Sequence, residues 1–508
     1  MNITAEQLAI VELWPEAKAV VSAVPGSGKT RVLVARIQKL IELGVDPKGI
    51  AAITFTNNAA REMEARLGES KIGYVGTIHK LLLNVIRFCW RDLGFSSKEI
   101  SPMDEDSFDA LVADAISIHS YKKLRSALLE EIHSTGHKSK TAIYIETMMK
   151  VHGLVPFDYI VKLGLQAYRA GIAPTHFTHV LLDEAQDTSD TDAELFSLLT
   201  ARAKGALVVG DPNQSIYGFR GGSPEFMQRL IADERNFGFF GLTETFRCTK
   251  QICEFSNSLS QTYKGLIGSN MQSSREGEPV SFVKVSAEDN VPQLMARMAK
   301  GSIEAGTKRV AILARLNDEV ASIREAALTQ GLKVARKYSK SGEWSYCVAA
   351  LSALLKPECP LAGRRYLTLK LGKSEAEKVI RQNEISFMSV GYGHVPDLMI
   401  CGCVTLPVEH IAQGLNEMGV TASAIAVFQS VAAKVSSSEE LLMECVGLRD
   451  ESEDDSDVFI GTIHSAKGLE FDHVILAPFV PTTEEHARLY YVAVTRAKSL
   501  LTICTTTS

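Results

Sequence analysis

The sequence predicts an α/β protein with two cores of parallel β-sheet, and two observations carry this prediction. Short apolar segments lead into loops of small and polar residues, as buried parallel strands do. Segments of helical periodicity, such as residues 30–43 and 58–67, alternate with them, which is typical of strand–helix–strand units. The expected strands are residues 19–22, 50–54, 179–182, 206–209, 309–313, 458–460 and 473–476.

The expected strands fall into two groups, and a long segment of mostly helical pattern interrupts each group. A chain of 508 residues is long enough for two to four domains of ordinary size. The simplest partition is therefore two α/β domains with one insertion each. We expect a first domain from residues 1–87 and 166–245 with an insertion at 88–165, and a second from 246–344 and 446–508 with an insertion at 345–445.

Composition excludes several classes of protein and restricts others. Hydrophobic residues make up 45% of the chain and charged residues 22%, which excludes collagen-like and largely disordered chains. Because 54 Lys and Arg residues are outnumbered by 60 Asp and Glu residues, any nucleic-acid site must be local rather than spread over the surface.

The cysteine count and the N-terminus predict the compartment. The nine cysteines are widely scattered, apart from Cys401 and Cys403, and we expect them to be free thiols in a reducing, cytoplasmic compartment. The first residues have no basic segment of the kind that starts a secretory signal. No apolar run reaches the roughly 20 residues that span a bilayer, so no membrane partner is expected.

A glycine-rich loop between the first strand and the first long helix predicts a nucleotide site. Glycines at positions 26 and 28 allow a tight turn whose N–H groups point at phosphate oxygens, and the helix start adds a favourable dipole. Lys29 supplies positive charge to the β- and γ-phosphates, and the Thr30 hydroxyl reaches Mg²⁺. The expected phosphate-binding loop comprises Ala23, Val24, Pro25, Gly26, Ser27, Gly28, Lys29 and Thr30, with Ala23 in place of the usual glycine.

Two acids follow the apolar strand at residues 179–182, at the edge where ligands bind in parallel sheets. We expect Asp183 to hold Mg²⁺ and Glu184 to polarise the attacking water as a general base. Such acids also occur at ordinary helix starts, but the upstream Lys29 and Thr30 favour the catalytic interpretation.

A third strand end, after residues 206–209, carries an amide, aromatics and an arginine. Gln214 lies where a side-chain amide senses the γ-phosphate, and Tyr217 and Phe219 flank Arg220. A plain turn beside a small hydrophobic cluster explains the aromatics, but it does not explain Gln214 and Arg220 together.

With these motifs the chain resembles the superfamily 1 DNA helicases of the UvrD/Rep/PcrA type, from Gln7 to Lys498 and in the family's order. Two long motifs near the C-terminus, GTIHSAKGLEF and YYVAVTRAK, make chance agreement negligible. The matching segments are residues 4–7, 23–30, 53–60, 76–79, 183–187, 210–222, 242–247, 311–315, 461–471 and 490–498. The resemblance implies two RecA-like motor domains that share one ATP site.

The resemblance also implies roles at that ATP site. Gln7 would read the adenine edge, Phe246 would stack on the base in place of the family's tyrosine, and Glu470 would accept from a ribose hydroxyl. Arg247 and Arg496 would be arginine fingers from the second domain, a role that can be worth roughly 10³–10⁵ in rate. With them, Lys29, Asp183, Glu184 and Gln214 complete the expected catalytic set.

Single-stranded DNA is the implied substrate, bound by stacking and by backbone contacts. Asn58 replaces a lysine usual in the family, and Phe219 replaces a tryptophan. The candidate DNA-binding residues are Phe55, Thr56, Asn57, Thr77, His79, Tyr217, Phe219, Arg220, Thr462 and His464.

The implied function is an ATP- and Mg²⁺-dependent 3′–5′ helicase or translocase acting on single-stranded and tailed duplex DNA in repair or replication, with partner proteins from those processes. The second insertion is short and the chain ends soon after Lys498, which favours translocation over strong unwinding and gives no place for a fused nuclease.

Alternatives are a translocase that only strips proteins from DNA, a nucleotide-gated scaffold without catalysis, and a plain P-loop kinase or transporter ATPase. Intact Lys29, Glu184 and Arg496 argue against a scaffold, and Gln214 with the two C-terminal motifs argues against a plain P-loop enzyme.

Overall fold

The structure, a computed structural model, describes most of residues 3–103, 138–334, 342–355, 408–433 and 457–506, together with isolated residues of 104–137, 366–370 and 441–445. Short gaps fall at residues 69, 175–176, 219–221, 223, 269 and 287–288. The chain divides into two compact units. One comprises residues 1–81, 175–336 and 452–508, and the other comprises residues 82–174 and 337–451.

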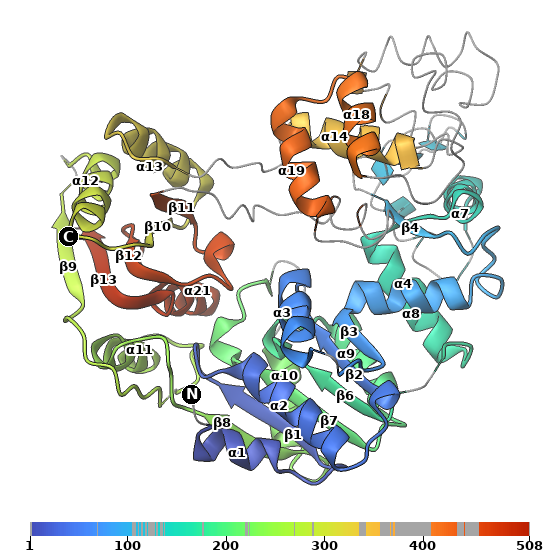
Figure 1. The fold of residues 1–508 in the computed structure, drawn as a ribbon, viewed down its shortest axis with the longest axis horizontal. Helices are drawn as coiled ribbons and strands as arrows, with labels where there is room; N and C mark the ends of the chain where they lie inside the picture. The colour runs from blue at the N-terminus through green and yellow to red at the C-terminus, as the bar shows by residue number, and fades with distance from the viewer. Residues whose placement is uncertain are drawn as a thin grey trace. The chain divides into compact units, whose positions relative to one another are not determined.

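The first unit contains two parallel sheets (Figure 1). Among the described residues, the first sheet has the order β3 (Tyr74–Thr77), β2 (Ile50–Thr54), β6 (His179–Leu182), β7 (Gly205–Gly210), β1 (Lys18–Ala23) and β8 (Gly238–Leu242). The second has the order β11 (Val458–Thr462), β10 (Val310–Ala314), β12 (Phe471–Leu476), β13 (Ala497–Thr506) and β9 (Ser281–Val285). Every pairing in both sheets is parallel, so the carboxyl ends of the strands in each sheet share one edge.

Helices cover the faces of these sheets because the strands are apolar on both sides. In the first sheet, α1 (Ala5–Val11), α2 (Lys29–Glu42) and α3 (Asn57–Leu67) share a core with β1. On β10, Val310 and Ile312 pack with α12 (Val291–Glu304) and α13 (Asn317–Thr329). The intervening Ala311 and Leu313 pack with α11 (Lys250–Thr262) and α21 (Glu484–Val494) on the opposite face.

The remaining helices of the first unit follow strands of the first sheet. These helices are α9 (Asp190–Thr200) and α10 (Glu225–Ala232), whose rings Phe196 and Phe226 meet edge to face at 5.5 Å. Short 3-10 turns occupy the loops at the carboxyl edges: η2 (Ala185–Asp187), η3 (Pro212–Gln214) and η6 (His464–Ala466). Another 3-10 turn, η1 (Pro47–Gly49), precedes β2.

The second unit is mainly helical in its described part. Its first segment contains most of α4 (Ile78–Phe88), then α7 (Lys140–His152) and α8 (Phe157–Arg169), with a short parallel pair of β4 (Ser101–Met103) and β5 (Leu154–Pro156) that the sequence analysis did not anticipate. Its second segment contains α14 (Gly342–Leu355), α18 (Val408–Glu417) and α19 (Ala422–Ala432), which share one hydrophobic cluster.

All seven strands expected from the sequence are present, and the helices expected at 30–43 and 58–67 are α2 and α3. The α/β class with parallel sheets is therefore confirmed. The described cysteines, Cys89, Cys248, Cys253, Cys347, Cys445 and Cys504, are free and buried. Cys359, Cys401 and Cys403 lie outside the described residues. Of the helices that the structure describes, none has the length and hydropathy to cross a membrane. The domain boundaries remain a prediction.

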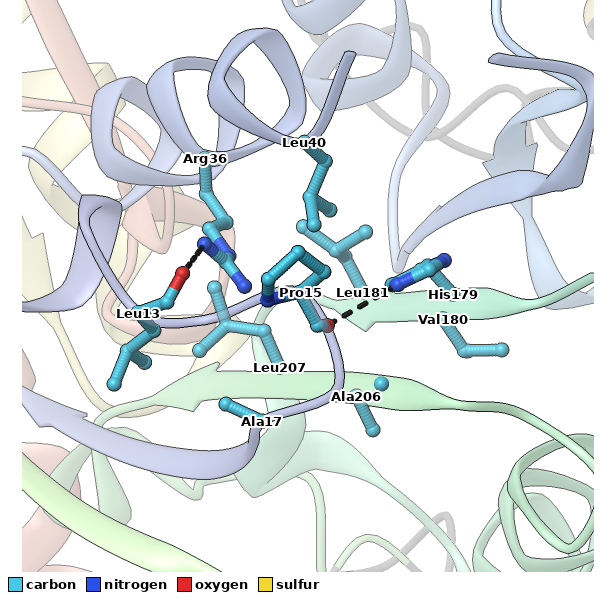
Figure 2. Close-up of a pocket in the computed structure, with 11 residues that line it drawn as sticks. Leu13, Pro15, Ala17, Arg36, Leu40, His179, Val180, Leu181, Ala206 and Leu207 are labelled. Atoms are coloured by element: carbon cyan, nitrogen blue, oxygen red, sulfur yellow. Dashed lines mark hydrogen bonds between the residues drawn. The ribbon is translucent and has the colours of Figure 1, made fainter. Parts of the chain in front are cut away.

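A small pocket at the amino edge of the first sheet shows how the N-terminal segment is fixed (Figure 2). The buried Arg36 guanidinium donates to the carbonyls of Val11 at 3.1 Å, Trp14 at 2.8 Å and Leu13. His179, the first residue of β6, donates through Nε2 to the carbonyl of Pro15 at 3.1 Å. Since these residues lie at the amino ends of β6 and β7, the pocket is opposite the edge that carries the motifs.

We expect Arg36→Met to destabilise the protein, because it removes the donors for three carbonyls while keeping an apolar stem. Leaving buried carbonyls unsatisfied should lower the free energy of unfolding by about 2–4 kcal/mol. Chemical denaturation followed by circular dichroism measures this change. The control is Arg66→Met, which removes an exposed helical pair with Glu62 and should cost no more than about 0.5 kcal/mol. Equal effects from the two variants would contradict the assigned role of Arg36.

Candidate active site

The glycine-rich loop connects β1 to α2 as the sequence analysis expected. Gly26 and Gly28 have φ angles of 75° and 84°, in the left-handed region that glycine tolerates. Gly28 is the N-cap of α2, so Lys29 and Thr30 begin the helix and the loop N–H groups precede its positive end. The Ser27 hydroxyl is buried and has no hydrogen-bond partner among the described residues. Such a loop fits a polyphosphate.

Asp183 and Glu184 directly follow β6 and lie beside this loop. Lys29 Nζ is 3.4 Å from Glu184 Oε1, and Glu184 donates its backbone N–H to Asp183 Oδ1 at 2.9 Å. Glu184 has φ 51° and ψ 38°, and it is the one non-glycine residue with a positive φ in the part of the chain that the structure describes. Strain of this kind concentrates at functional sites, where the surrounding structure holds it.

Opposing charges set the protonation of the two acids. Burial, together with the negative charge of Glu184, raises the pKa of Asp183. Burial also acts to raise the pKa of Glu184, but the ammonium groups of Lys29 and Lys467 outweigh it, so that this pKa lies well below its usual range. Glu184 is therefore ionised at neutral pH and able to accept a proton.

A chain of hydrogen bonds continues from Glu184 toward the second sheet. Gln186 donates its side-chain amide to Glu184 Oε2 at 2.5 Å, and Gln186 Oε1 accepts from the Asp211 backbone at 2.9 Å. Gln214 Nε2 donates to Asp211 Oδ2 at 2.8 Å. Arg496 Nη2 then donates to Gln214 Oε1 at 2.9 Å. The network joins a phosphate-binding loop on one sheet to an arginine from the other.

Arg496 is fixed by its own surroundings. It is buried, and it donates to the carbonyls of Val492 at 3.1 Å and Leu469 at 3.2 Å. Burial, with a smaller contribution from the nearby Arg247, lowers the pKa of Arg496 to about 9, so the guanidinium remains charged at neutral pH. A positive charge held in a low-dielectric site stabilises a phosphoryl group far better than one in water.

The segment after β8 passes directly over the glycine-rich loop. Phe246 donates its backbone N–H to the Gly26 carbonyl at 2.9 Å, and the Thr245 hydroxyl donates to the Pro25 carbonyl at 2.7 Å. A Cβ added to Gly26 would lie 2.5 Å from Arg247 Cβ. This close approach explains why glycine is needed at position 26 and places Arg247 beside the loop.

Two residues with implied roles at the base and sugar already have protein partners. Gln7 is buried and donates its side-chain amide to the Ser27 carbonyl at 2.8 Å. Glu470 accepts from Arg247 Nε at 3.0 Å and pairs with Lys498 Nζ at 2.6 Å. Although burial opposes it, Lys498 and Arg247 lower the pKa of Glu470.

The residues present fit a nucleotide with a magnesium ion. No group of three or more His, Cys, Asp and Glu residues within the described ranges is arranged to hold a metal alone. Mg²⁺ in nucleotide sites takes one or two protein ligands and completes its shell with phosphates and water. Thr30 and the buried Asp183 fit that requirement.

The candidate DNA residues that the structure describes lie at the carboxyl ends of strands or in the turns and helices that follow them. Phe55 and Thr56 follow β2, Thr77 ends β3, and Thr462 ends β11. Thr56 is the N-cap of α3, where its hydroxyl accepts from Ala59 at 3.2 Å; Asn57 begins that helix, and His79 is the second residue of α4.

Tyr217 and His464 are a pair of candidate DNA residues that the structure brings together from the two sheets. Tyr217 follows η3 and His464 begins η6, and their ring centroids are 6.4 Å apart. Phe219 and Arg220 lie outside the described residues.

Several residues of this site were missed by the sequence analysis. Asp187 and Gln186 lie within the acidic motif and Asp211 precedes Gln214, so their positions beside recognised residues were an available signal. Tyr491 donates its hydroxyl to Asp211 Oδ2 at 3.4 Å, and Lys467 Nζ contacts the Asp187 carboxylate. These two come from the C-terminal motifs, and only the fold pairs them with the first sheet.

Comparison with known proteins agrees with this geometry. The model of the UvrD/REP helicase N-terminal domain matches residues 3–151 and 139–234. The model of the UvrD-like helicase C-terminal domain matches residues 425–508. The chain belongs to the UvrD/Rep family of helicases. Its α/β architecture of two parallel sheets is the one expected for that family.

Three relatives illustrate the similarity of this UvrD-like chain. Gabija protein GajB of Bacillus cereus is 26% identical over 501 residues, which cover 95% of this chain and 92% of that protein. DNA helicase II of Escherichia coli is 29% identical over 356 residues, 62% of this chain and 48% of the relative. ATP-dependent DNA helicase PcrA of Staphylococcus epidermidis is 23% identical over 614 aligned positions, 100% of this chain and 84% of the relative. The expected enzyme class, an ATP-dependent DNA helicase, agrees with the latter two names, since both print a DNA helicase and the PcrA name also prints the dependence on ATP.

We expect Gly26→Ala to impair nucleotide binding much more than it impairs folding. Its Cβ would meet both Arg247 Cβ and, at 2.7 Å, the Thr245 hydroxyl, so the segment over the loop must shift. The Kd for a fluorescent ATP analogue should rise at least about tenfold, a change of roughly 1.4 kcal/mol.

The control is Gly44→Ala. Gly44 has a φ angle of 86° and nothing within 4 Å of the added Cβ, so this variant carries the same backbone strain without the collision. Its free energy of unfolding should fall by about 1–2 kcal/mol, with ATP binding unchanged. Unaltered binding in Gly26→Ala would show that the Arg247 segment is not part of the nucleotide site.

Proposed function

We propose that this protein is an ATP-driven motor that moves along single-stranded DNA in the 3′–5′ direction and unwinds tailed duplexes. The observation that carries the proposal is the hydrogen bond from Arg496 to Gln214, in a network that continues to Glu184 and Lys29. A nucleotide held at that network touches both α/β halves, so its hydrolysis changes the contacts between them. A plain P-loop enzyme has no use for the second sheet.

Each residue of the network has a role in hydrolysis. Lys29 binds the β- and γ-phosphates and leaves the carboxylate of Glu184, which then takes a proton from the attacking water. Thr30 and Asp183 would hold Mg²⁺, and the bound ion would neutralise developing charge on the phosphates. Gln214 senses the γ-phosphate, while Arg247 and Arg496 stabilise the negative charge of the transition state.

Movement follows from the change of partners at the arginines. Arg496 is bonded to Gln214, and Arg247 is bonded to Glu470 and, at 3.2 Å, to the Thr495 carbonyl. When the γ-phosphate offers a stronger anionic partner, both guanidiniums turn to it and the halves close. Loss of that phosphate restores the protein contacts and lets the two halves separate again.

The DNA contacts lie on loops near this network. Tyr217 stacks on bases, and backbone contacts come from polar residues at the strand ends. Their positions at the carboxyl edges of both sheets support a strand that crosses from one half to the other. The remaining contacts proposed are Phe55, Thr56, Asn57, Thr77, His79, Phe219, Arg220, Thr462 and His464. We place the motor in DNA repair or replication, with proteins of those processes as partners.

We expect Lys29→Ala and Glu184→Gln each to reduce ATP turnover by at least about 10²-fold, because they remove the phosphate-binding charge and the general base. A coupled-enzyme ATPase assay with single-stranded DNA measures this loss. The control is Glu42→Gln, which changes an exposed carboxylate at the end of α2 and should leave turnover unchanged. Turnover near the wild-type rate in either active-site variant would refute the assignment.

We expect single-stranded DNA to stimulate the ATPase strongly, and duplexes with 3′ tails to be unwound in preference to those with 5′ tails. ATPase assays with single-stranded DNA, duplex DNA and RNA in parallel test the substrate class. A strand-separation assay beside displacement of streptavidin from biotinylated DNA distinguishes a helicase from a translocase that only clears proteins. Stimulation by RNA alone would contradict a DNA substrate.

A further inference from the structure

One mostly buried lysine, which takes no step in the proposed reaction, joins the nucleotide side of the first sheet to a candidate base-stacking residue. Lys467 follows η6 on the second half of the unit, after β11. Its Nζ lies 2.6 Å from Asp187 Oδ1, 2.5 Å from Asp187 Oδ2 and 2.8 Å from the Gln214 carbonyl. All three oxygens belong to loops of the first sheet.

The ammonium is almost completely enclosed by these contacts. The side chains of Lys467 and Asp187 are 9% and 4% exposed. An ammonium has three N–H donors, and the Asp187 carboxylate with the Gln214 carbonyl accounts for them. On a further side the ring of Tyr217 lies with its centroid 4.7 Å from Nζ, a distance typical of a cation–π contact.

The two side-chain partners of Lys467 lie next to different sites: Asp187 is in the turn that contains Glu184, and Tyr217 is beside the candidate DNA residue His464. Asp187 is the last residue of η2, the turn whose N-cap is the strained Glu184, and Gln186 in the same turn donates to Glu184. Tyr217 is three residues after Gln214 and close to His464, which is three residues before Lys467. A displacement of the Tyr217 ring therefore reaches the Glu184 turn through a single side chain.

Stability alone does not explain an ion pair at this place. Removing two charges from water costs about as much as their attraction returns, and an apolar pair of similar volume is often equally stable. The loop containing Gln214 has other anchors on the second half: Arg488 Nε donates to the Ser215 carbonyl at 2.8 Å, and Asn213 exchanges two hydrogen bonds of 2.8 Å with the Ile267 backbone. The contact of Lys467 with the Gln214 carbonyl is thus not required merely to attach that loop.

We propose that Lys467 is the positioning residue that couples DNA at Tyr217 and His464 to the alignment of Asp187 and Gln214 at the ATP site. This inference rests on the proposed function and adds to it the residue through which the two ligands communicate. A base that stacks on Tyr217 moves the ring against the ammonium, and the ammonium carries Asp187 and the Gln214 carbonyl with it. By linkage, nucleotide at the ATP site changes DNA affinity by the same factor.

The test measures this coupling as a ratio of affinities. The Kd of the full chain for a fluorescent oligo(dT) is measured by anisotropy with and without a non-hydrolysable ATP analogue and Mg²⁺. For the wild type the two values should differ by a factor in the range of about 5–150, which is typical of coupled sites. In Lys467→Met the factor should fall to within about twofold of unity, while the enzyme still binds both ligands singly.

Three further variants distinguish coupling from structural damage. Lys467→Arg keeps the positive charge and should retain most of the change in DNA affinity caused by the ATP analogue. Asp187→Asn removes the negative charge of the ion pair and should abolish that change. The double variant Lys467→Met/Asp187→Asn should lose no more than either single change, because the two residues act as one unit. The control Lys39→Met removes a lysine paired with Glu12 at 3.0 Å, far in sequence from these loops, and should keep the wild-type factor.

The possible outcomes separate the proposed function from the coupling role of Lys467. A wild type without ATPase activity or DNA binding overturns the proposed function. A wild type that hydrolyses ATP but shows no coupling, or a Lys467→Met variant with the full wild-type factor, overturns this inference alone. If Lys467→Met does not fold, as judged by circular dichroism, Asp187→Asn decides, and a wild-type factor there also overturns it.

Discussion

The arrangement of the two sheets in the first unit depends on one largely buried polar network that crosses between them. It starts at Lys29, passes through Glu184, Gln186 and Asp211, and ends where Arg496 meets Gln214. Charged groups in a low-dielectric interior are tolerated only when each has its partners, and a half-satisfied network is worse than an apolar core. The carboxyl edges of both sheets must therefore keep their relative positions for this network to persist, and a nucleotide is the natural ligand to reorganise it.

The loop after β7 links the two halves of this arrangement. By chain connectivity it belongs to the first sheet, yet residues of the second half hold it at several points: Arg496 and Lys467 at Gln214, Arg488 at Ser215, and Tyr491 at Asp211. A loop that is shared in this way has two sets of possible partners. It is suited to switch between arrangements, because packed interfaces tend to change between discrete states rather than deform continuously.

Most central strands were predictable from the sequence and most edge strands were not, although the edge strand β11 was predicted and the central strand β13 was missed. β10 and β6 are buried along their whole length and appear as continuous apolar runs. The edge strands β8 and β9 carry exposed residues, with Phe239 54% and Phe282 56% exposed, and β8 contains two glycines. With one side unpaired and a face in water, such strands lose the apolar signature, so only their parallel partners β1 and β13 define them.

Residue types and their places after strands were determined by the sequence alone, since a glycine-rich loop, an acidic pair and arginines in long motifs are local features. What only the tertiary structure decided is which of them meet. Lys467 and Asp187 are 280 residues apart in the chain, and Arg496 and Gln214 are 282 apart, yet both pairs are in hydrogen-bond contact. The physical reason is that parallel strands gather their carboxyl ends at one edge, and two such edges facing each other create pairs that no local pattern contains.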